Sequence, residues 1–316
     1  MHTTAWPEAR TPSGVRASGH AGVTMGGFEP AEATEGNRPV SKPLLQELIL
    51  TLYGLYAPDG LLPVAGLVGL LADLDVDEGA ARSTISRLKS KNVLERADGA
   101  GPVRYSVSPA VLDRFQAGDE RIFTPQRSEP GDPWALVVFS VPEAERKRRY
   151  ELRTELTSLG FGFMASGVAI APATVLDQAL ERLAARGLSR YLEHFTGHYG
   201  DAATLRERIG QWWDLGGLDA QYADFIDDYG PCLQQWSARG KAAPQLDGPG
   251  RREAFALYVP LLTRWRRFPY RDPNIPLELL PVGWRAPQAK MLFLQLHGLL
   301  AAPALDHAEA VLAPSS

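Results

Sequence analysis

A short segment near the amino end combines basic and hydroxyl side chains in a pattern that suits contact with DNA. Residues 82–91 include no acid; the basic members are Arg82, Arg87, Lys89 and Lys91, and the serines are Ser83, Ser86 and Ser90. At about 100° per residue, Arg82, Ser86 and Lys89 fall on one arc of a helix, with Arg87 and the other serines beside it. Long cations reach guanine edges and phosphates in the major groove, while short hydroxyls let the backbone approach. The segment predicts a DNA-contacting helix; the alternative is a helix face that meets only solvent.

Two further helices are expected to hold this basic helix in place. Apolar residues recur at helical spacing over 45–56, and a second apolar stripe follows Pro63, which suits a first helical position. Asp77 suits the N-cap of the basic helix, which we expect to run to about residue 92. The arc expected to pack inward contains Ala81, Ile85, Leu88 and Asn92.

A β-hairpin is predicted directly after the basic helix. Two strand-like runs, 93–97 and 103–107, are joined by Asp98-Gly99-Ala100-Gly101, which is typical of a hairpin turn. Arg96 and Arg104 flank that turn. They either contact DNA as a wing does or are ordinary exposed strand residues. Three helices and a hairpin predict a winged helix-turn-helix domain over residues 41–108.

The pattern changes after residues 109–132, which are expected to form a linker with one weak helix. The next elements are a strand at 135–141, a helix at 143–159, strands near 162–164 and 167–171, a helix at 174–186 and a strand at 191–199. This β-α-β-β-α-β order predicts a ferredoxin-like domain over residues 133–200. Its first helix contains the basic run Arg146–Arg149. That run contacts the DNA backbone, contacts a second subunit, or is a solvated helix face.

The remainder of the chain is predicted to be helical. Breaks are expected at residues 216–217, near 247–250 and through 269–287, within an all-helical domain over residues 201–305. Residues 1–40, which include the alternative start Met25, and residues 306–316 are expected to be tails. The fold class is therefore α+β with several domains.

Composition limits the classes of function. The chain has 316 residues, 45% hydrophobic and 22% charged, with a net charge of −4 and one cysteine, Cys232. One cysteine excludes an internal disulfide framework, and Cys232 is expected to be a small buried residue. Near-neutral charge argues against a globally basic nucleic-acid coat protein but allows a locally basic surface. No transmembrane helix or signal peptide is predicted, so the expected location is the cytoplasm.

Several sequence blocks, in a consistent order, resemble the PaaX family of transcriptional repressors. The resemblance covers roughly residues 44–300, and its most specific block is Arg267-Phe268-Pro269-Tyr270-Arg271-Asp272-Pro273-Asn274-Ile275-Pro276. The other blocks are residues 45–56, 134–143, 159–162, 213–215, 279–281 and Trp284. The resemblance implies a DNA-binding winged helix, a central domain like the Cas2 nuclease fold and a helical C-terminal domain. It also implies a homodimer on operator DNA, control of phenylacetic acid catabolism, and release by an aryl-CoA thioester such as phenylacetyl-CoA.

An effector site of this kind is expected in the helical domain. A CoA thioester requires an apolar slot and cations for its phosphates. The candidate effector-binding residues are Arg264, Arg267, Arg271, Tyr270, Trp284 and Trp213. Two alternatives are open. The aromatic residues at near-helical spacing form an ordinary core, and Arg271 with Asp272 forms an ion pair that locks the loop 269–276.

Catalytic chemistry is not expected. Nucleases that share the Cas2-like fold carry an aspartate at the end of the first strand, where this chain has Phe139-Ser140-Val141-Pro142. His194 and His198 have no neighbouring ligand residues, which favours structural roles over a metal site. Gly160-Phe161-Gly162 follows a helix and precedes a strand, the reverse of a dinucleotide loop. We expect no enzyme activity, no catalytic residue, no cofactor, no metal and no membrane partner.

The sequence therefore favours a cytoplasmic, dimeric repressor of an aromatic-compound operon that binds double-stranded operator DNA. A protein of another class is the alternative. It would bind or process a CoA thioester or another small molecule and use its N-terminal module only for protein association.

Overall fold

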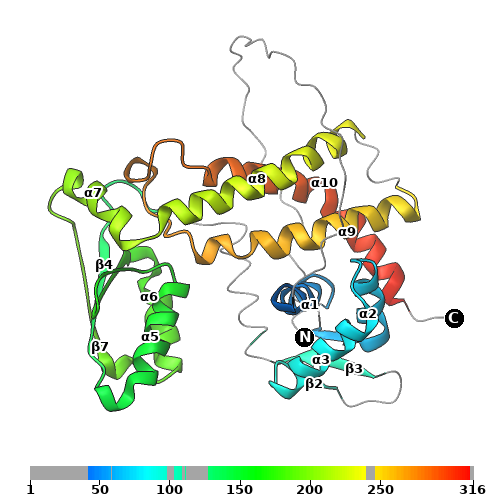
Figure 1. Ribbon diagram of the computed structural model, residues 1–316, viewed down its shortest axis with the longest axis horizontal. Helices are drawn as coiled ribbons and strands as arrows, with labels where there is room; N and C mark the ends of the chain where they lie inside the picture. Colours follow the sequence, from blue (N-terminus) through cyan, green and yellow to red (C-terminus); the bar gives the residue numbers. More distant parts are fainter. Residues whose placement is uncertain are drawn as a thin grey trace, which may run out of the picture. The chain divides into compact units, whose positions relative to one another are not determined.

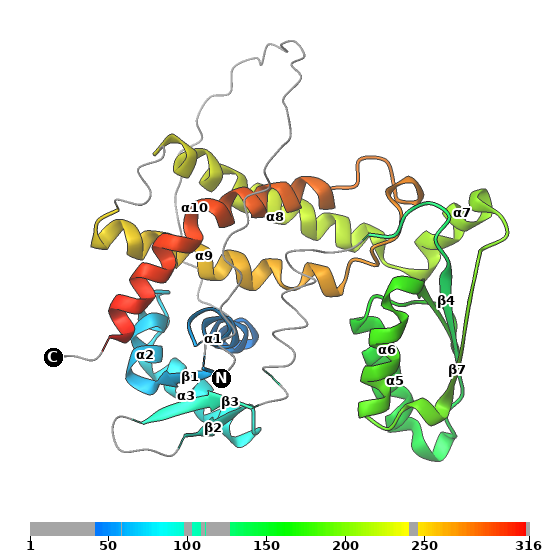
Figure 2. The same cartoon turned by 180° about the vertical axis from the view of Figure 1, so that it is seen from behind.

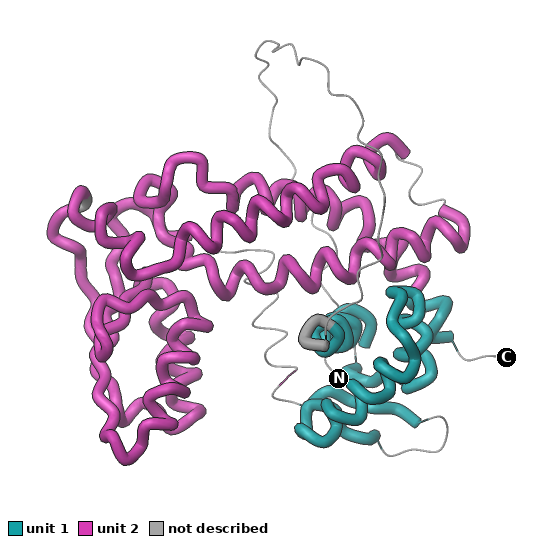
Figure 3. The backbone as a smooth tube through the Cα atoms, in the orientation of Figure 1, with its two compact units in different colours: residues 1–108, 308–316 teal, residues 109–307 magenta. Residues whose placement is uncertain are grey.

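The computed structural model describes residues 42–57, 59–97, 103–108, 111, 127–239 and 246–313. The chain forms two compact units, one of residues 1–108 with 308–316 and the other of residues 109–307 (Figure 3). The predicted tail 1–40 with Met25, the predicted turn 98–101 and most of the predicted linker lie outside the described residues.

The first unit packs helices against a small antiparallel sheet (Figure 1). Its helices are α1 (Lys42–Tyr56), α2 (Val64–Ala72) and α3 (Glu78–Ser90), and its sheet has the order β1 (Leu61–Pro63), β3 (Arg104–Val107), β2 (Leu94–Arg96). The predicted apolar stripes form the core, which includes Leu48, Ile49, Leu52, Leu67, Leu70, Leu71, Ala81, Ile85 and Leu88. One Asp77 carboxylate oxygen accepts the Ala80 N–H at 3.0 Å, so α3 begins where the N-cap prediction places it.

The structure differs from the sequence prediction at the start of the second helix and at the end of the third. Pro63 ends strand β1, and α2 begins one residue later. Strand β1 was not predicted because three residues are too few to show an alternating pattern. The inward arc ends at Leu88, since Asn92 follows the helix with a φ of 54° and is exposed. Thr84, which the predicted arc did not include, is fully buried on the inward side of α3.

The carboxyl end of the chain belongs to this first unit. Helix α10 (Ala286–Leu312) runs through most of the predicted tail 306–316. A Cβ built on Gly66 of α2 would lie 2.6 Å from Leu312 Cδ2, and one on Gly69 would lie 3.3 Å from Val311 Cγ1. The two glycines therefore let the last turn of α10 lie close to α2.

The central part of the second unit has the predicted β-α-β-β-α-β order. Its elements are β4 (Trp134–Phe139), η1 (Glu143–Glu145), α5 (Arg146–Ser158), β5 (Gly162–Ala165), β6 (Val168–Pro172), η2 (Ala173–Val175), α6 (Leu176–Ala185), η3 (Ser189–Tyr191) and β7 (Leu192–Gly197). The sheet has the order β5-β6-β4-β7, with every neighbouring pair antiparallel. Helices α5 and α6 lie on one face of it (Figure 2). Val137 and Phe139 of β4 pack there with Leu152, Leu156 and Leu183 of the helices.

The opposite face of the sheet is partly covered by later segments. Trp134 and Ile170 pack with Leu205 and Ile209 of α7 (Ala202–Trp212). At the start of β5, Gly162 lies directly under Trp213: a Cβ there would be 2.6 Å from the indole Cε2. Trp213 Nε1 also donates to the Gly160 carbonyl oxygen at 2.9 Å. Two of the sequence blocks that carried the family resemblance therefore contact each other.

Substitution G162A is expected to destabilise the second unit. The new methyl group would meet a rigid indole and the Trp212 carbonyl oxygen at 2.9 Å, so the backbone must shift at a cost of about 1–3 kcal/mol. Thermal unfolding followed by circular dichroism should show a lower Tm. The matched control is G197A, because no atom lies within 4 Å of a Cβ at Gly197. Equal Tm values for the two variants would contradict the close approach.

Three helices with an aromatic core make up the rest of the described second unit. They are α8 (Leu215–Ala238), α9 (Gly248–Trp265) and the first part of α10, with the short turns η5 (Phe268–Tyr270) and η6 (Leu277–Leu279) between α9 and α10. Trp265 of α9 lies between Phe225 of α8 and Phe293 of α10, at centroid distances of 5.4 and 4.7 Å. The predicted break at residues 216–217 is wrong, because the Asp214 carboxylate accepts the Gly217 N–H and starts α8 there. None of the helices that the structure describes is long and apolar enough to cross a membrane.

Candidate nucleic-acid interface and ligand pocket

The residues of the predicted DNA-contacting arc lie on the surface of α3 and the turn that follows it. Arg87 is half-buried, and the exposed members are Arg82, Ser83, Ser86, Lys89, Ser90 and Lys91. The opposite side of α3 holds Ala81, Ile85 and Leu88 in the core. The packing of α3 therefore separates its cationic face from its apolar face, as the spacing predicts.

Contacts within α3 keep these cations in place without burying them. Arg82 Nε lies 2.7 Å from Glu78 Oε1 in a pair whose side chains are both more than half exposed. Arg87 Nη2 donates to the Thr84 hydroxyl at 2.9 Å, which ties it to the core. An exposed pair of this kind contributes only about 0.3–0.5 kcal/mol, so a phosphate readily replaces the glutamate.

The hairpin strands place two more cations beside the sheet. Arg96 pairs in register with Tyr105, and the Ala97 N–H donates to the Arg104 carbonyl oxygen. Both arginines are exposed, on either side of residues 98–102, which lie outside the described part. The Tyr53 hydroxyl donates to the Tyr105 carbonyl oxygen at 3.1 Å, and burial raises the pKa of Tyr53. This bond fixes the hairpin to α1.

The second unit contains a pocket between α5 and the η5 turn. It has a volume of about 560 Å³ and is lined by Tyr150, Arg153, Thr154, Thr157, Ser158, Arg267, Tyr270 and Arg271. Three of the predicted effector residues, Arg267, Tyr270 and Arg271, are thus brought together. The α5 side of the pocket was not predicted, because nothing in its spacing links it to residues over a hundred positions later.

The other three predicted effector residues do not line this pocket. Arg264 forms an ion pair with Asp228 of α8. Trp213 covers β5, as described above, and Trp284 lies edge-on to Tyr222 at a centroid distance of 5.9 Å. Trp213 and Trp284 both pack against the cluster on the second face of the sheet. For these two aromatic residues, the alternative of a structural core fits the observed contacts.

A buried carboxylate, Asp272, follows the pocket residue Arg271 in the chain. Asp272 is 5% exposed and accepts from Arg127 Nη2 at 3.0 Å, from the Tyr222 hydroxyl at 3.0 Å and from the Asn274 N–H at 2.8 Å. The pKa of Tyr222 is raised by burial and then by the negative charge of Asp272. The expected ion pair between Arg271 and Asp272 is replaced by one with Arg127, because Arg127 reaches this site from the segment before β4.

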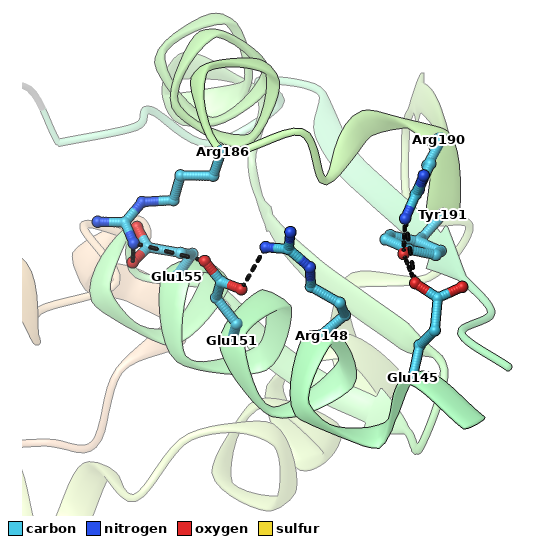
Figure 4. Close-up of polar contacts among 7 residues, drawn as sticks. All are labelled: Glu145, Arg148, Glu151, Glu155, Arg186, Arg190 and Tyr191. Carbon is cyan, nitrogen blue, oxygen red and sulfur yellow. Dashed lines mark hydrogen bonds and ion pairs between the residues drawn. The ribbon is translucent and has the colours of Figure 1, made fainter. Parts of the chain in front are cut away.

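The basic run at the start of α5 is partly neutralised by ion pairs. Arg148 pairs with Glu151 of the next turn, while Arg149 pairs with Glu143. Figure 4 shows two acidic residues of α5, Glu151 and Glu155, which both pair with Arg186 directly after α6. At the other end of the same view, Glu145 accepts from Arg190 and from the Tyr191 hydroxyl. These contacts fasten α5 to its neighbours.

The remaining candidate residues are the histidines and Cys232, which could in principle bind a metal ion. Among the described residues there is no group of three or more His, Cys, Asp or Glu side chains arranged to hold a metal ion. His194 is on strand β7, paired in register with Val137. Cys232 was expected to be buried but is only half-buried, on α8.

Family models match three successive parts of the chain. Residues 45–111 match a family model described as PaaX-like protein, residues 127–209 match the PaaX protein central Cas2-like domain, and residues 213–310 match the PaaX-like protein C-terminal domain. The transcriptional repressor PaaX of Escherichia coli (strain K12) is 26% identical over 263 residues, covering 82% of this chain and 81% of that protein. An uncharacterized protein from Mycobacterium tuberculosis has a similar solved structure, with 23% identity, a TM-score of 0.49, and coverage of 85% of this chain and 97% of that one.

Proposed function

This chain belongs to the PaaX family of transcriptional repressors, and on that premise we propose that it is an effector-released repressor of an aromatic-compound catabolic operon. The N-terminal unit acts as a winged helix that binds operator DNA. A homodimer presents two such units to paired half-sites, and an aryl-CoA thioester such as phenylacetyl-CoA releases them. The protein works in the cytoplasm and performs no catalysis.

The exposed cationic face of α3 is the observation that carries the proposal. Arg82, Ser86 and Lys89 point away from the core of their unit, and no acidic residue interrupts the segment 82–91. A helix in the major groove needs such a face, with long cations for phosphates and guanine edges. Arg96 and Arg104, on the strands after α3, suit phosphate contacts by a wing.

The outer strand of the central sheet supports a homodimer. Strand β7 pairs with β4 on one side, and no other described strand pairs with it. Phe195 on β7 is 60% exposed, and Val138 on the neighbouring β4 is 39% exposed. Open strand edges with apolar side chains tend to pair with another chain, and a two-fold axis here would satisfy both copies equally.

Binding to the DNA upstream of the protein's own gene, followed by fluorescence anisotropy, tests the proposal. We expect a specific isotherm whose log affinity falls linearly with log salt, with a slope of about −0.9 for each phosphate contacted. A scrambled duplex of equal length is the control. Equal affinity for both duplexes would contradict a sequence-reading repressor and favour the alternative of a small-molecule-binding protein with an association module.

A further inference from the structure

The pocket between α5 and η5 contains two arginines, Arg153 and Arg271, that form no ion pair with a described carboxylate. Three arginines line it and none of its eight lining residues is acidic. Arg153 donates to the Ser166 carbonyl oxygen at 3.2 Å and stacks over Phe163 at 3.9 Å. Arg271 donates to the Gln221 side-chain oxygen. Arg153 and Arg271 are therefore positioned by neutral partners, and neither forms an ion pair with a carboxylate that the structure describes.

Two acidic residues that are close in the chain to pocket residues are paired with other arginines. Glu155, on the same helix as Arg153, pairs with Arg182 of α6 and with Arg186, which directly follows that helix. Asp272, next to Arg271 in the chain, pairs with Arg127. Because both carboxylates form ion pairs with arginines outside the pocket, they reduce the positive potential of the pocket only at longer range. An anion that enters the pocket would meet cations first.

The threonine and serine hydroxyls of the pocket are already used as donors inside α5. Thr154 donates to the Tyr150 carbonyl oxygen, and Thr157 donates to the Arg153 carbonyl oxygen. Ser158 donates to the Glu155 carbonyl oxygen. The capacity to bind an anion therefore lies in the guanidinium groups, whose planar donors match the oxygens of a phosphate in pairs.

Two tyrosine rings give the same pocket a flat apolar surface. Tyr150 is 76% exposed, which is unusual for a large ring, and Tyr270 lines the pocket from the η5 turn. A volume of about 560 Å³ lies within the range of about 300–1,000 Å³ that is usual for ligand sites. The combination suits a ligand that carries phosphate at one end and an organic group at the other.

We infer that this pocket binds the phosphate groups of an organic phosphate, with Arg153 and Arg271 contacting the phosphate oxygens and Tyr150 and Tyr270 contacting the organic part. The inference rests on the proposed function for the identity of the ligand, since coenzyme A carries a diphosphate and a 3′-phosphate. It extends that function by assigning half of the site to α5. The α5 residues lie in the central family match and the η5 residues in the C-terminal one, so the ligand bridges two domains.

Isothermal titration of the full-length protein with coenzyme A, pantetheine and pyrophosphate tests the inference. We expect coenzyme A to bind, pyrophosphate to bind more weakly and pantetheine, which lacks phosphate, not to bind. R153Q and R271Q should each weaken coenzyme A binding by about tenfold or more, because each removes a charge-assisted contact. The matched control is R148Q, on the same helix, whose side chain pairs with Glu151 and does not line the pocket.

Each outcome decides the inference separately from the proposed repressor function. Unchanged coenzyme A affinity in R153Q and R271Q, or equal losses in R148Q, would overturn it. If coenzyme A binds no more tightly than pyrophosphate, the pocket holds an adventitious ion only and the inference is overturned. Absence of binding by any of the three probes would also overturn the inference. The operator isotherm of each variant without ligand shows that the protein is folded. It should match the wild type whether or not the pocket binds phosphate.

Discussion

Reversing one charge on α3, in the variant K89E, is expected to lower the affinity for operator DNA by about a hundredfold. Lys89 is exposed on the same arc as Arg82 and Ser86, and its ammonium group lies 5.8 Å from the Tyr105 ring centroid. A glutamate there removes a cation from the groove and adds repulsion toward the phosphates. Anisotropy titrations at one fixed salt concentration measure the change.

The control for K89E is R208E, which makes the same charge change on an exposed side chain of α7. If loss of affinity only reflected the net charge of the protein, the two variants would weaken binding equally. A loss confined to K89E supports α3 as the DNA-contacting helix. Wild-type affinity in K89E would remove α3 from the interface.

Truncating the buried carboxylate, in the variant D272A, is expected to cost about 3–5 kcal/mol of unfolding free energy. Asp272 accepts from Arg127 Nη2 and from the buried Tyr222 hydroxyl, and both would lose this acceptor, while Arg127 Nη1 keeps the neutral Ile275 carbonyl oxygen. Arg127 would then carry a charge at a site where its side chain is only 24% exposed. Calorimetry should show a Tm lower by on the order of 10 °C.

The exposed carboxylate Asp306 of α10 provides the comparison for this second variant, as D306A. D306A removes a carboxylate that is exposed to solvent and leaves no buried donor without an acceptor. Its Tm should therefore stay within about 2 °C of the wild type. If D272A and D306A unfold at the same temperature, the buried network contributes nothing to stability.

Local patterns in the sequence are sufficient to predict the elements that carry the candidate DNA contacts. The 3.6-residue period separates Ala81, Ile85 and Leu88 from the exposed Arg82 and Lys89, because burial on one side of a helix needs only that spacing. The β-α-β-β-α-β order is likewise predicted, since the runs of β4, β5 and β6 are mainly apolar and are followed by a turn residue or a polar helix.

Contacts between distant segments could not be predicted in this way. Arg127 and Asp272 are separated by 145 positions, and no periodicity connects them. The same holds for Arg153 and Arg271, which line one pocket because the fold brings α5 and η5 to either side of it. The prediction of Arg267, Tyr270 and Arg271 therefore identified one wall of the pocket. The opposite wall, on α5, is defined only by the three-dimensional fold.

The contact of Val311 and Leu312 with the glycines of α2 has a consequence for protein synthesis. The amino-terminal unit is completed by the end of α10, which the ribosome adds long after residue 108, although amino-terminal domains generally fold first during translation. A nascent chain, or one shortened by a premature stop codon before Ala308, leaves the Gly66 and Gly69 side of α2 uncovered. The amino-terminal unit is therefore complete only after α10 has been translated to its end.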